Sequence, residues 1–137
     1  DVGDASLWPE EPDLVLALHA CGPASDAVIA RATGARARVL LLVPCCTGLA
    51  VESARRGRAR AEELGLPDEG PVRARFVEAW VAAERTWELE VAGYETEVVE
   101  LVSPTVTPYN LLWRARRVGE PGRIAAARRA LDRMRRS

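Results

Sequence analysis

Two short, unbroken apolar runs constrain the fold of this chain more than any other feature. The segments Leu14–Leu18 and Val39–Val43 each contain five apolar residues and no polar residue. Such runs are too short for independent helices and are typical of strands that are buried on both faces. Between them, Ser25 can cap a short helix that Gly34 ends. The pattern therefore predicts a βαβ unit with parallel strands and a right-handed crossover.

Three further helices are expected downstream of this unit. Residues 51–64 are compatible with a helix, although Gly57 weakens it. Residues 73–91 give the strongest helical signal, because apolar side chains recur there at three- and four-residue spacing: Phe76, Trp80, Ala83, Trp87 and Val91. Residues 121–136 are expected to form a basic C-terminal helix. Four of its side chains would face the core: Ile124, Ala127, Leu131 and Met134.

Two more strands are expected before the last helix. Residues 95–102 have β character with interleaved glutamates, which is typical of a strand at a sheet edge. Residues 110–118 form the next strand, and the connection between the two suits antiparallel neighbours. The sequence therefore predicts an α/β fold in which two parallel strands are followed by an antiparallel hairpin, with flanking helices.

Length and charge narrow the class of protein. The 137 residues, of which 48% are hydrophobic, suffice for one domain with a core, so we treat residues 1–137 as a single domain. The formal net charge of -1 gives no overall attraction to nucleic acid or to an anionic membrane. No segment approaches the ~20 apolar residues that span a bilayer, and no charged-then-apolar leader opens the chain. We expect a cytoplasmic protein without a membrane partner.

The three cysteines do not indicate a disulfide framework. Their number is odd, and Cys45 and Cys46 are adjacent, so a bridge between those two would be strained. We therefore expect Cys21, Cys45 and Cys46 to be reduced thiols in the cytoplasm.

The most informative feature for function is where the two apolar runs end. The first run is followed by His19, Ala20, Cys21 and Gly22, and the second by Pro44, Cys45 and Cys46. If the strands are parallel neighbours, both segments leave the same carboxyl edge of the sheet, where open α/β sheets bind ligands. The residues alone leave a plainer alternative open, in which His19 and the cysteines only fill space beneath loops.

These segments also carry a resemblance to a known family. The segment DLVLALHACG at residues 13–22, with Ser25 and Asp26 after it, is followed by VPCC at residues 43–46, AGY at residues 92–94 and TPYNLL at residues 107–112. In this order the motifs resemble class I S-adenosylmethionine-dependent methyltransferase domains whose strands end in His-Ala-Cys-Gly and Pro-Cys-Cys. A related branch comprises tRNA 2′-O-methyltransferases. The resemblance covers residues 13–118 and corresponds to the C-terminal half of such a domain.

The resemblance implies a Rossmann-like sheet of seven strands, of which this chain would supply the last four. Residues 110–118 would lie between residues 39–43 and residues 95–102. The methionine and methyl end of S-adenosylmethionine would lie beside His19, Ala20, Cys21 and Gly22. The first strands and their glycine-rich turn would come from an upstream half that binds the rest of the cofactor.

The resemblance also implies roles for individual residues. His19 is the only histidine, and we expect it to be the base that removes a proton from the methyl acceptor. Cys45 and Cys46, which we count with His19 as catalytic, would shape the acceptor pocket as neutral thiols. Three further residues would contact the acceptor: Pro44, Tyr109 and Asn110. Asn110 can alternatively organise the turn before its strand.

Several alternatives stay open. Zinc could be held by His19, Cys21, Cys45 and Cys46, but neither His-Ala-Cys nor Cys-Cys has the spacing of a zinc knuckle, so we expect no metal. The chain could be a truncated, non-catalytic interaction module, since it lacks a glycine-rich nucleoside-binding turn. The arginine-rich helices could contact RNA, although solvated helix faces explain them as well. An upstream half-domain or a second copy would cover the open edge of Leu14–Leu18.

Overall fold

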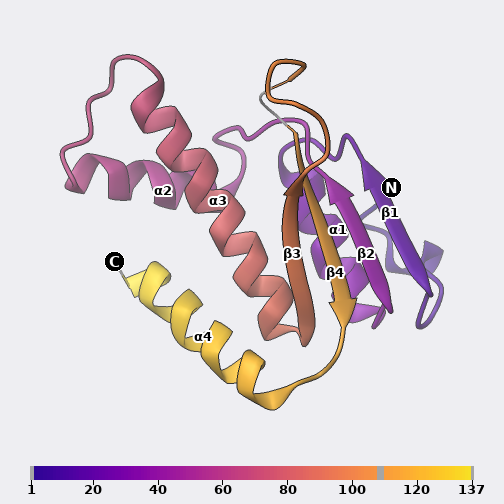
Figure 1. Cartoon of the computed structure of the whole chain (residues 1–137). Helices are drawn as coiled ribbons and strands as arrows, with labels where there is room; N and C mark the ends of the chain where they lie inside the picture. Colours follow the sequence, from indigo (N-terminus) through magenta and orange to yellow (C-terminus); the bar gives the residue numbers. More distant parts are fainter. Residues whose placement is uncertain (1, 108–109, 137) are drawn as a thin grey trace.

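The computed structural model describes residues 2–107 and 110–136, and within them it shows a mixed α/β fold with a four-stranded sheet (Figure 1). The strands are β1 (Leu14–Leu18), β2 (Val39–Val43), β3 (Tyr94–Glu100) and β4 (Leu111–Arg117), in the spatial order β1-β2-β4-β3. β1 and β2 are parallel, and β4 runs antiparallel to both β2 and β3. The predicted βαβ unit and the predicted hairpin are therefore confirmed.

The four expected helices are also present. They are α1 (Pro23–Gly34), α2 (Glu52–Glu63), α3 (Pro71–Val91) and α4 (Pro121–Arg136), and a short 3-10 helix, η1 (Ala5–Leu7), precedes the sheet. The predicted cap of α1 was wrong, because Gly22 precedes the helix and Pro23 opens it. Proline suits the first helical position, since it has no N–H to satisfy and its φ is already helical. Ser25 is buried instead, and its hydroxyl donates to the carbonyl of Ala20.

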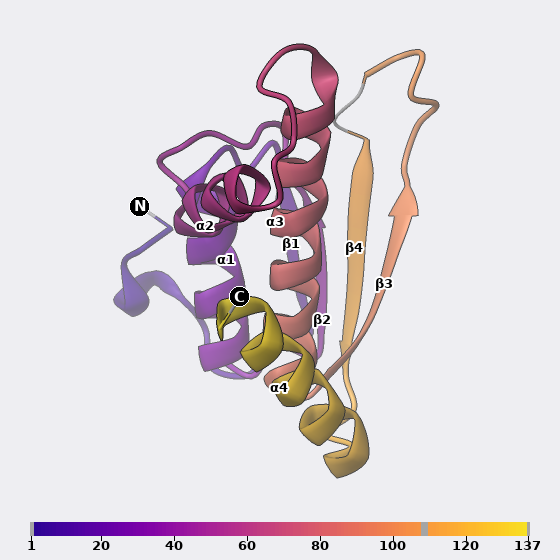
Figure 2. The same ribbon diagram turned by 90° about the vertical axis from the view of Figure 1, so that its left-hand side faces the viewer.

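All four helices lie on one side of the sheet (Figure 2). α1 and α3 contact the sheet, and α2 and α4 pack against α3. The core between the sheet and its helices contains the alternate side chains of β2 and β4 and the inner side chains of α1: Leu40, Leu42, Trp113, Ala115, Val28 and Ile29. Alternate side chains of a strand point to opposite faces of the sheet, and the helices cover the face to which the buried side chains of β2 and β4 point.

The buried side of α3 differs from the predicted apolar stripe. The five residues of that stripe are only half-buried, and the buried residues of α3 are Val81, Glu84, Arg85, Leu89 and Glu90. α3 is contacted by α1, α2, α4 and β3, so its burial is not confined to one face. Because the charged side chains among these residues have ionic partners, they can be buried without an apolar stripe.

The sheet face that points away from the helices is open at β1. The side chains of Leu14, Leu16 and Leu18 are 52%, 58% and 60% exposed, whereas Val15 and Ala17 pack against the core. β1 is also an edge strand. Its apolar sequence is suited to burial on both faces, but only one face is covered in the described part of the chain.

No helix in the described part of the chain is long and apolar enough to cross a membrane.

Candidate functional site

The two strand-end segments meet at the carboxyl edge of the sheet, as predicted. Leu18 pairs with Val43, so the residues that follow, His19 and Pro44, leave neighbouring strands side by side. Sγ of Cys45 lies 3.8 Å from the carbonyl oxygen of His19. The N–H of Gly22 donates to the carbonyl of Cys46 over 3.4 Å, which joins the two segments once more. The two segments therefore lie side by side at this edge, as expected.

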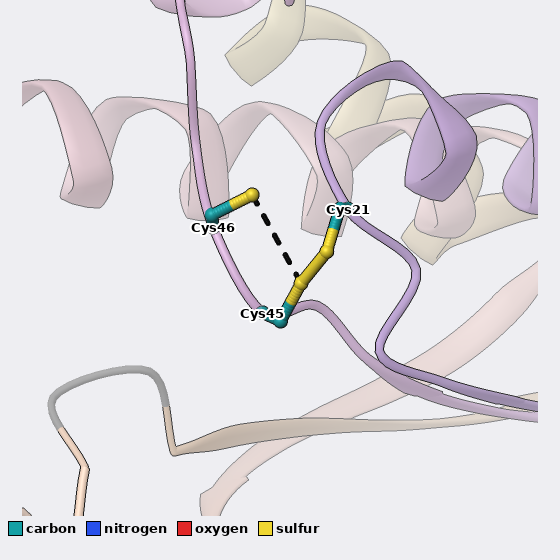
Figure 3. Close-up of side chains that lie close together, drawn as sticks. All are labelled: Cys21, Cys45 and Cys46. Carbon is teal, nitrogen blue, oxygen red and sulfur yellow. Dashed lines mark hydrogen bonds between the residues drawn. A yellow bond between two sulfur atoms is a disulfide. The ribbon is translucent and has the colours of Figure 1, made fainter.

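The state of the cysteines differs from the prediction. Cys21 and Cys45 form a disulfide, and Cys46 is a free, exposed thiol whose Sγ lies 3.9 Å from Sγ of Cys45 (Figure 3). The Cα atoms of Cys21 and Cys45 are 5.3 Å apart, within the usual range for a disulfide. The expectation of reduced, neutral thiols was wrong because it rested only on the odd number of cysteines and on the adjacency of two of them. The pairing of β1 with β2 brings together two cysteines that are distant in sequence.

The turn after β1 has an uncommon backbone conformation. His19 has a φ of 57°, in the left-handed region that non-glycine residues rarely occupy, and its side chain is exposed. Gly22 has a φ of 54°, and an added Cβ there would meet no atom within 4 Å. The backbone of this turn therefore borders open space beside the sheet edge. A strained residue at such an edge is a feature of functional sites.

A small cavity of about 60 Å³ lies beside the strand-end segments. Its wall includes residues that follow β2, residues of α3 and residues of β4: Pro44, Cys46, Glu78, Arg85, Leu111 and Trp113. Of the predicted site residues, Pro44 and Cys46 line this cavity, whereas His19 lies on the β1 side of the crevice. The sequence prediction missed the contributions of α3 and β4, since nothing local marks those side chains as neighbours of the strand ends.

Arg85 is the main site residue that sequence reasoning missed. Its guanidinium is buried, donates from Nε to Oδ1 of Asp26 over 2.7 Å, and donates from Nη2 to the carbonyl of Gly22 over 3.2 Å. Asp26 lies in the first turn of α1. Arg85 therefore connects the cavity wall to the turn that holds residues 19–22.

The residues predicted to contact the acceptor from the β3–β4 connection are only partly placed. Tyr109 lies outside the described residues. Asn110 is buried, its side-chain Nδ2 donates to the carbonyl of Val102 over 2.8 Å, and its own carbonyl accepts from the N–H of Leu101 over 2.7 Å. β3 ends at Glu100, two residues before the predicted boundary. The side chain of Asn110 organises the connection, which is the alternative that the sequence left open.

The arginine-rich helices use several of their arginines in structural ion pairs. Glu84, which is buried in α3, accepts hydrogen bonds from Arg56 of α2 and from Arg135 of α4, the latter over 2.8 Å. Burial alone would lower the pKa of Arg56, but the hydrogen bond and the charge of Glu84 outweigh it and raise that pKa. Arg123 pairs with Glu90 over 2.6 Å. These arginines hold α2 and α4 against α3.

Comparisons with known proteins give one match. Residues 4–52 match the family model of a methyltransferase domain, and no curated protein and no solved structure matches the chain. The matched segment contains β1, α1 and β2, and both strand-end segments of the crevice lie within it. The match therefore supports a methyltransferase family for the part of the chain that contains the two strand-end segments.

Proposed function

We propose that this chain provides the acceptor side of the active site of an S-adenosylmethionine-dependent methyltransferase. One observation carries the proposal: the segments at residues 19–22 and 44–46 meet at one sheet edge, and both lie within the segment that matches a methyltransferase domain. Ligands of open α/β sheets bind at that edge. We place the enzyme in the cytoplasm, in keeping with the expectation from its sequence.

The turn after β1 fits one end of the cofactor. His19 and Cys21 are exposed, and open space borders Gly22, so the segment His19, Ala20, Cys21 and Gly22 would lie along the methionine end. S-adenosylmethionine, when bound, supplies an electrophilic methyl group on a sulfonium. The described residues contain no glycine-rich turn for the nucleoside. We therefore infer that the chain binds the cofactor weakly without a further cofactor-binding half.

The residues around the cavity would position the acceptor. Leu111 and Trp113 give it an apolar wall, and Glu78 and Arg85 add charged groups. The cavity is small and open to solvent, so most of the acceptor would lie outside it. The exposed imidazole of His19 would take the proton of a protonated acceptor as the methyl group is transferred. RNA is among the candidate acceptors, together with protein and small molecules.

The open side of β1 would be covered by a partner. β1 is an edge strand with no strand partner on its outer side among the described residues, and three of its leucines are exposed. A strand that pairs with this edge, together with a helix over the leucines, would complete a sheet covered on both faces. We propose that an upstream half-domain or a second copy of the chain fills this position.

The test measures transfer of labelled methyl groups from S-adenosylmethionine to separated RNA, protein and small-molecule fractions. The chain is assayed alone and within the full reading frame that encodes it. Label should enter one fraction, and His19→Ala should lower turnover by about 100-fold or more while cofactor affinity changes little. Absence of label from every fraction, with cofactor bound, would count against the enzyme and favour an interaction module. Unchanged turnover in His19→Ala would contradict the role of His19 as the base, but it would not contradict the methyltransferase activity.

A further inference from the structure

Three sulfur atoms converge in the crevice. The Sγ atoms of Cys21, Cys45 and Cys46 all lie within 4.8 Å of one another (Figure 3). Cys21 comes from the turn between β1 and α1, and the two others follow β2. We propose that these cysteines, once the disulfide between Cys21 and Cys45 is reduced, bind one zinc ion through three thiolates.

One sulfur–sulfur distance already suits a tetrahedral metal, and reduction of the disulfide would free the sulfur atoms of Cys21 and Cys45. Four ligands with Zn–S bonds of ~2.3 Å stand about 3.8 Å apart at the corners of a tetrahedron. Sγ of Cys45 and Sγ of Cys46 are already 3.9 Å apart. Reduction would let the Sγ atoms of Cys21 and Cys45 move apart, and the 5.3 Å between their Cα atoms leaves room for side-chain rotation. Zinc can therefore be bound without moving either strand end.

The way in which the ligands are held explains why their spacing does not resemble a zinc knuckle. A knuckle brings two cysteines together within one short turn. Here the parallel pairing of β1 with β2 and the bond from the Gly22 N–H to the Cys46 carbonyl fix the two segments relative to each other. Two sheet-bound segments can preorganise a site as well as a knuckle does. Spacing along the chain is therefore a poor guide to this site.

The fourth coordination position would be open. Among the described residues, the group of potential ligands contains the three cysteines and no fourth side chain. A water molecule would complete the tetrahedron, as in zinc sites that keep an exchangeable ligand. Cys21 and Cys46 are exposed, so both the ion and a reductant can reach the sulfurs.

Zinc binding and the disulfide exclude each other. A dithiol reductant would transfer two electrons and two protons to the Cys21–Cys45 bond, giving two thiols and leaving the reductant as a disulfide. Binding of zinc would then release the three thiol protons to solvent. The oxidised chain offers only the Cys46 sulfur. The zinc site does not depend on methyl transfer, so its test needs no assay of activity.

The experiment compares the reduced and the oxidised chain. After reduction with a phosphine, which is then removed, three thiols per chain are verified with a thiol reagent. Zinc is titrated against a chromophoric chelator, and Co²⁺ is then added in place of zinc. We expect one zinc per reduced chain, thiolate-to-cobalt charge-transfer absorption with the intense visible bands of tetrahedral cobalt, and no binding to the oxidised chain.

Two variants locate the site. Cys46→Ser keeps the cysteines of the disulfide but removes one ligand, and its zinc affinity should fall by more than the ~10- to 100-fold that loss of an outer-shell partner costs. Thr47→Ala, a change at the neighbouring residue, should leave the affinity unchanged. The proposal is overturned if reduced chains with three verified thiols bind no zinc, or if Cys46→Ser binds it as tightly as the wild type.

Discussion

Nε of Arg85 lies 2.7 Å from Oδ1 of Asp26, so an ion pair joins the middle of α3 to the first turn of α1. Nη2 of Arg85 also donates to the carbonyl of Gly22, at the turn that precedes α1. The arginine is 2% exposed and the aspartate side chain is 37% exposed. The position of residues 19–22 therefore depends on a partly buried charge pair as well as on the sheet.

Removal of Asp26 should destabilise the fold. Asp26→Ala leaves the buried guanidinium of Arg85 without its counter-charge, which costs ~3–5 kcal/mol in fully buried pairs. Because Asp26 is partly solvated, we expect a loss of about 2 kcal/mol in the free energy of unfolding, measured by denaturant titration. Asp13→Ala is the matched control, since Asp13 pairs with Arg38 on the surface and its loss should cost under ~1 kcal/mol. Equal losses in the two variants would contradict a structural role for the Arg85 pair.

Gly57 should be intolerant of a side chain. An added Cβ would stand 2.9 Å from Cγ of Trp80, because α2 and α3 approach closely at this point. The overlap should cost ~1–3 kcal/mol and exceed the ~1 kcal/mol that alanine gains over glycine in a helix. Gly57→Ala should therefore lower the melting temperature, whereas Gly34→Ala, which meets no atom within 4 Å, should keep or raise it. A stabilised Gly57→Ala would mean that α2 and α3 pack less closely.

The hydroxyl of Tyr94 should make stability sensitive to alkaline pH. It donates to the carbonyl of Ala37 over 2.7 Å, and burial raises the pKa of Tyr94 above its usual value of 10.0, although the charge of Arg117 opposes this. The folded state thus favours the neutral phenol. Its contribution is complete below pH 10.0 and is lost as the pH rises from there through the folded pKa.

Tyr94→Phe tests this dependence. The variant should be about 1 kcal/mol less stable than the wild type at neutral pH, because the carbonyl of Ala37 loses a donor. That difference should shrink above pH 10.0, because the phenylalanine has no proton to lose. Denaturant titrations at a series of pH values give both curves. Parallel curves at all pH values would contradict the assignment.

The sequence predicted the parts of the fold that depend on local pattern. The apolar runs predicted β1, β2 and the sheet edge where both end, and the proline and glycine breaks predicted where α3 lies. The 3-10 helix η1 was not predicted. The disulfide between Cys21 and Cys45 and the pair between Arg85 and Asp26 join residues that are far apart in sequence. Such contacts depend on how elements pack, so no local pattern marks them. For the same reason the apolar stripe of α3 did not predict which of its residues are buried.

The exposed leucines of β1 lead to the last prediction, which concerns self-association of the chain. Leu14, Leu16 and Leu18 form an apolar row on the open sheet face, beside an edge whose backbone donors and acceptors have no strand partner among the described residues. Burial of such side chains contributes roughly 25 cal/mol for each Å² of apolar surface, and strand pairing at the edge adds hydrogen bonds. The purified chain should therefore dimerise or aggregate as its concentration rises.

Leu16→Lys places a charge in the middle of that row without changing the covered face of β1. We expect it to shift the chain toward the monomer in sedimentation velocity and light scattering. Val106→Lys is the matched control, because Val106 is 74% exposed in the β3–β4 connection and lies far along the chain from β1. The control should associate as the wild type does. If Leu16→Lys associates like the wild type and the control, the open face of β1 does not bind a second chain. That result would also contradict the proposal that a cofactor-binding half covers this edge.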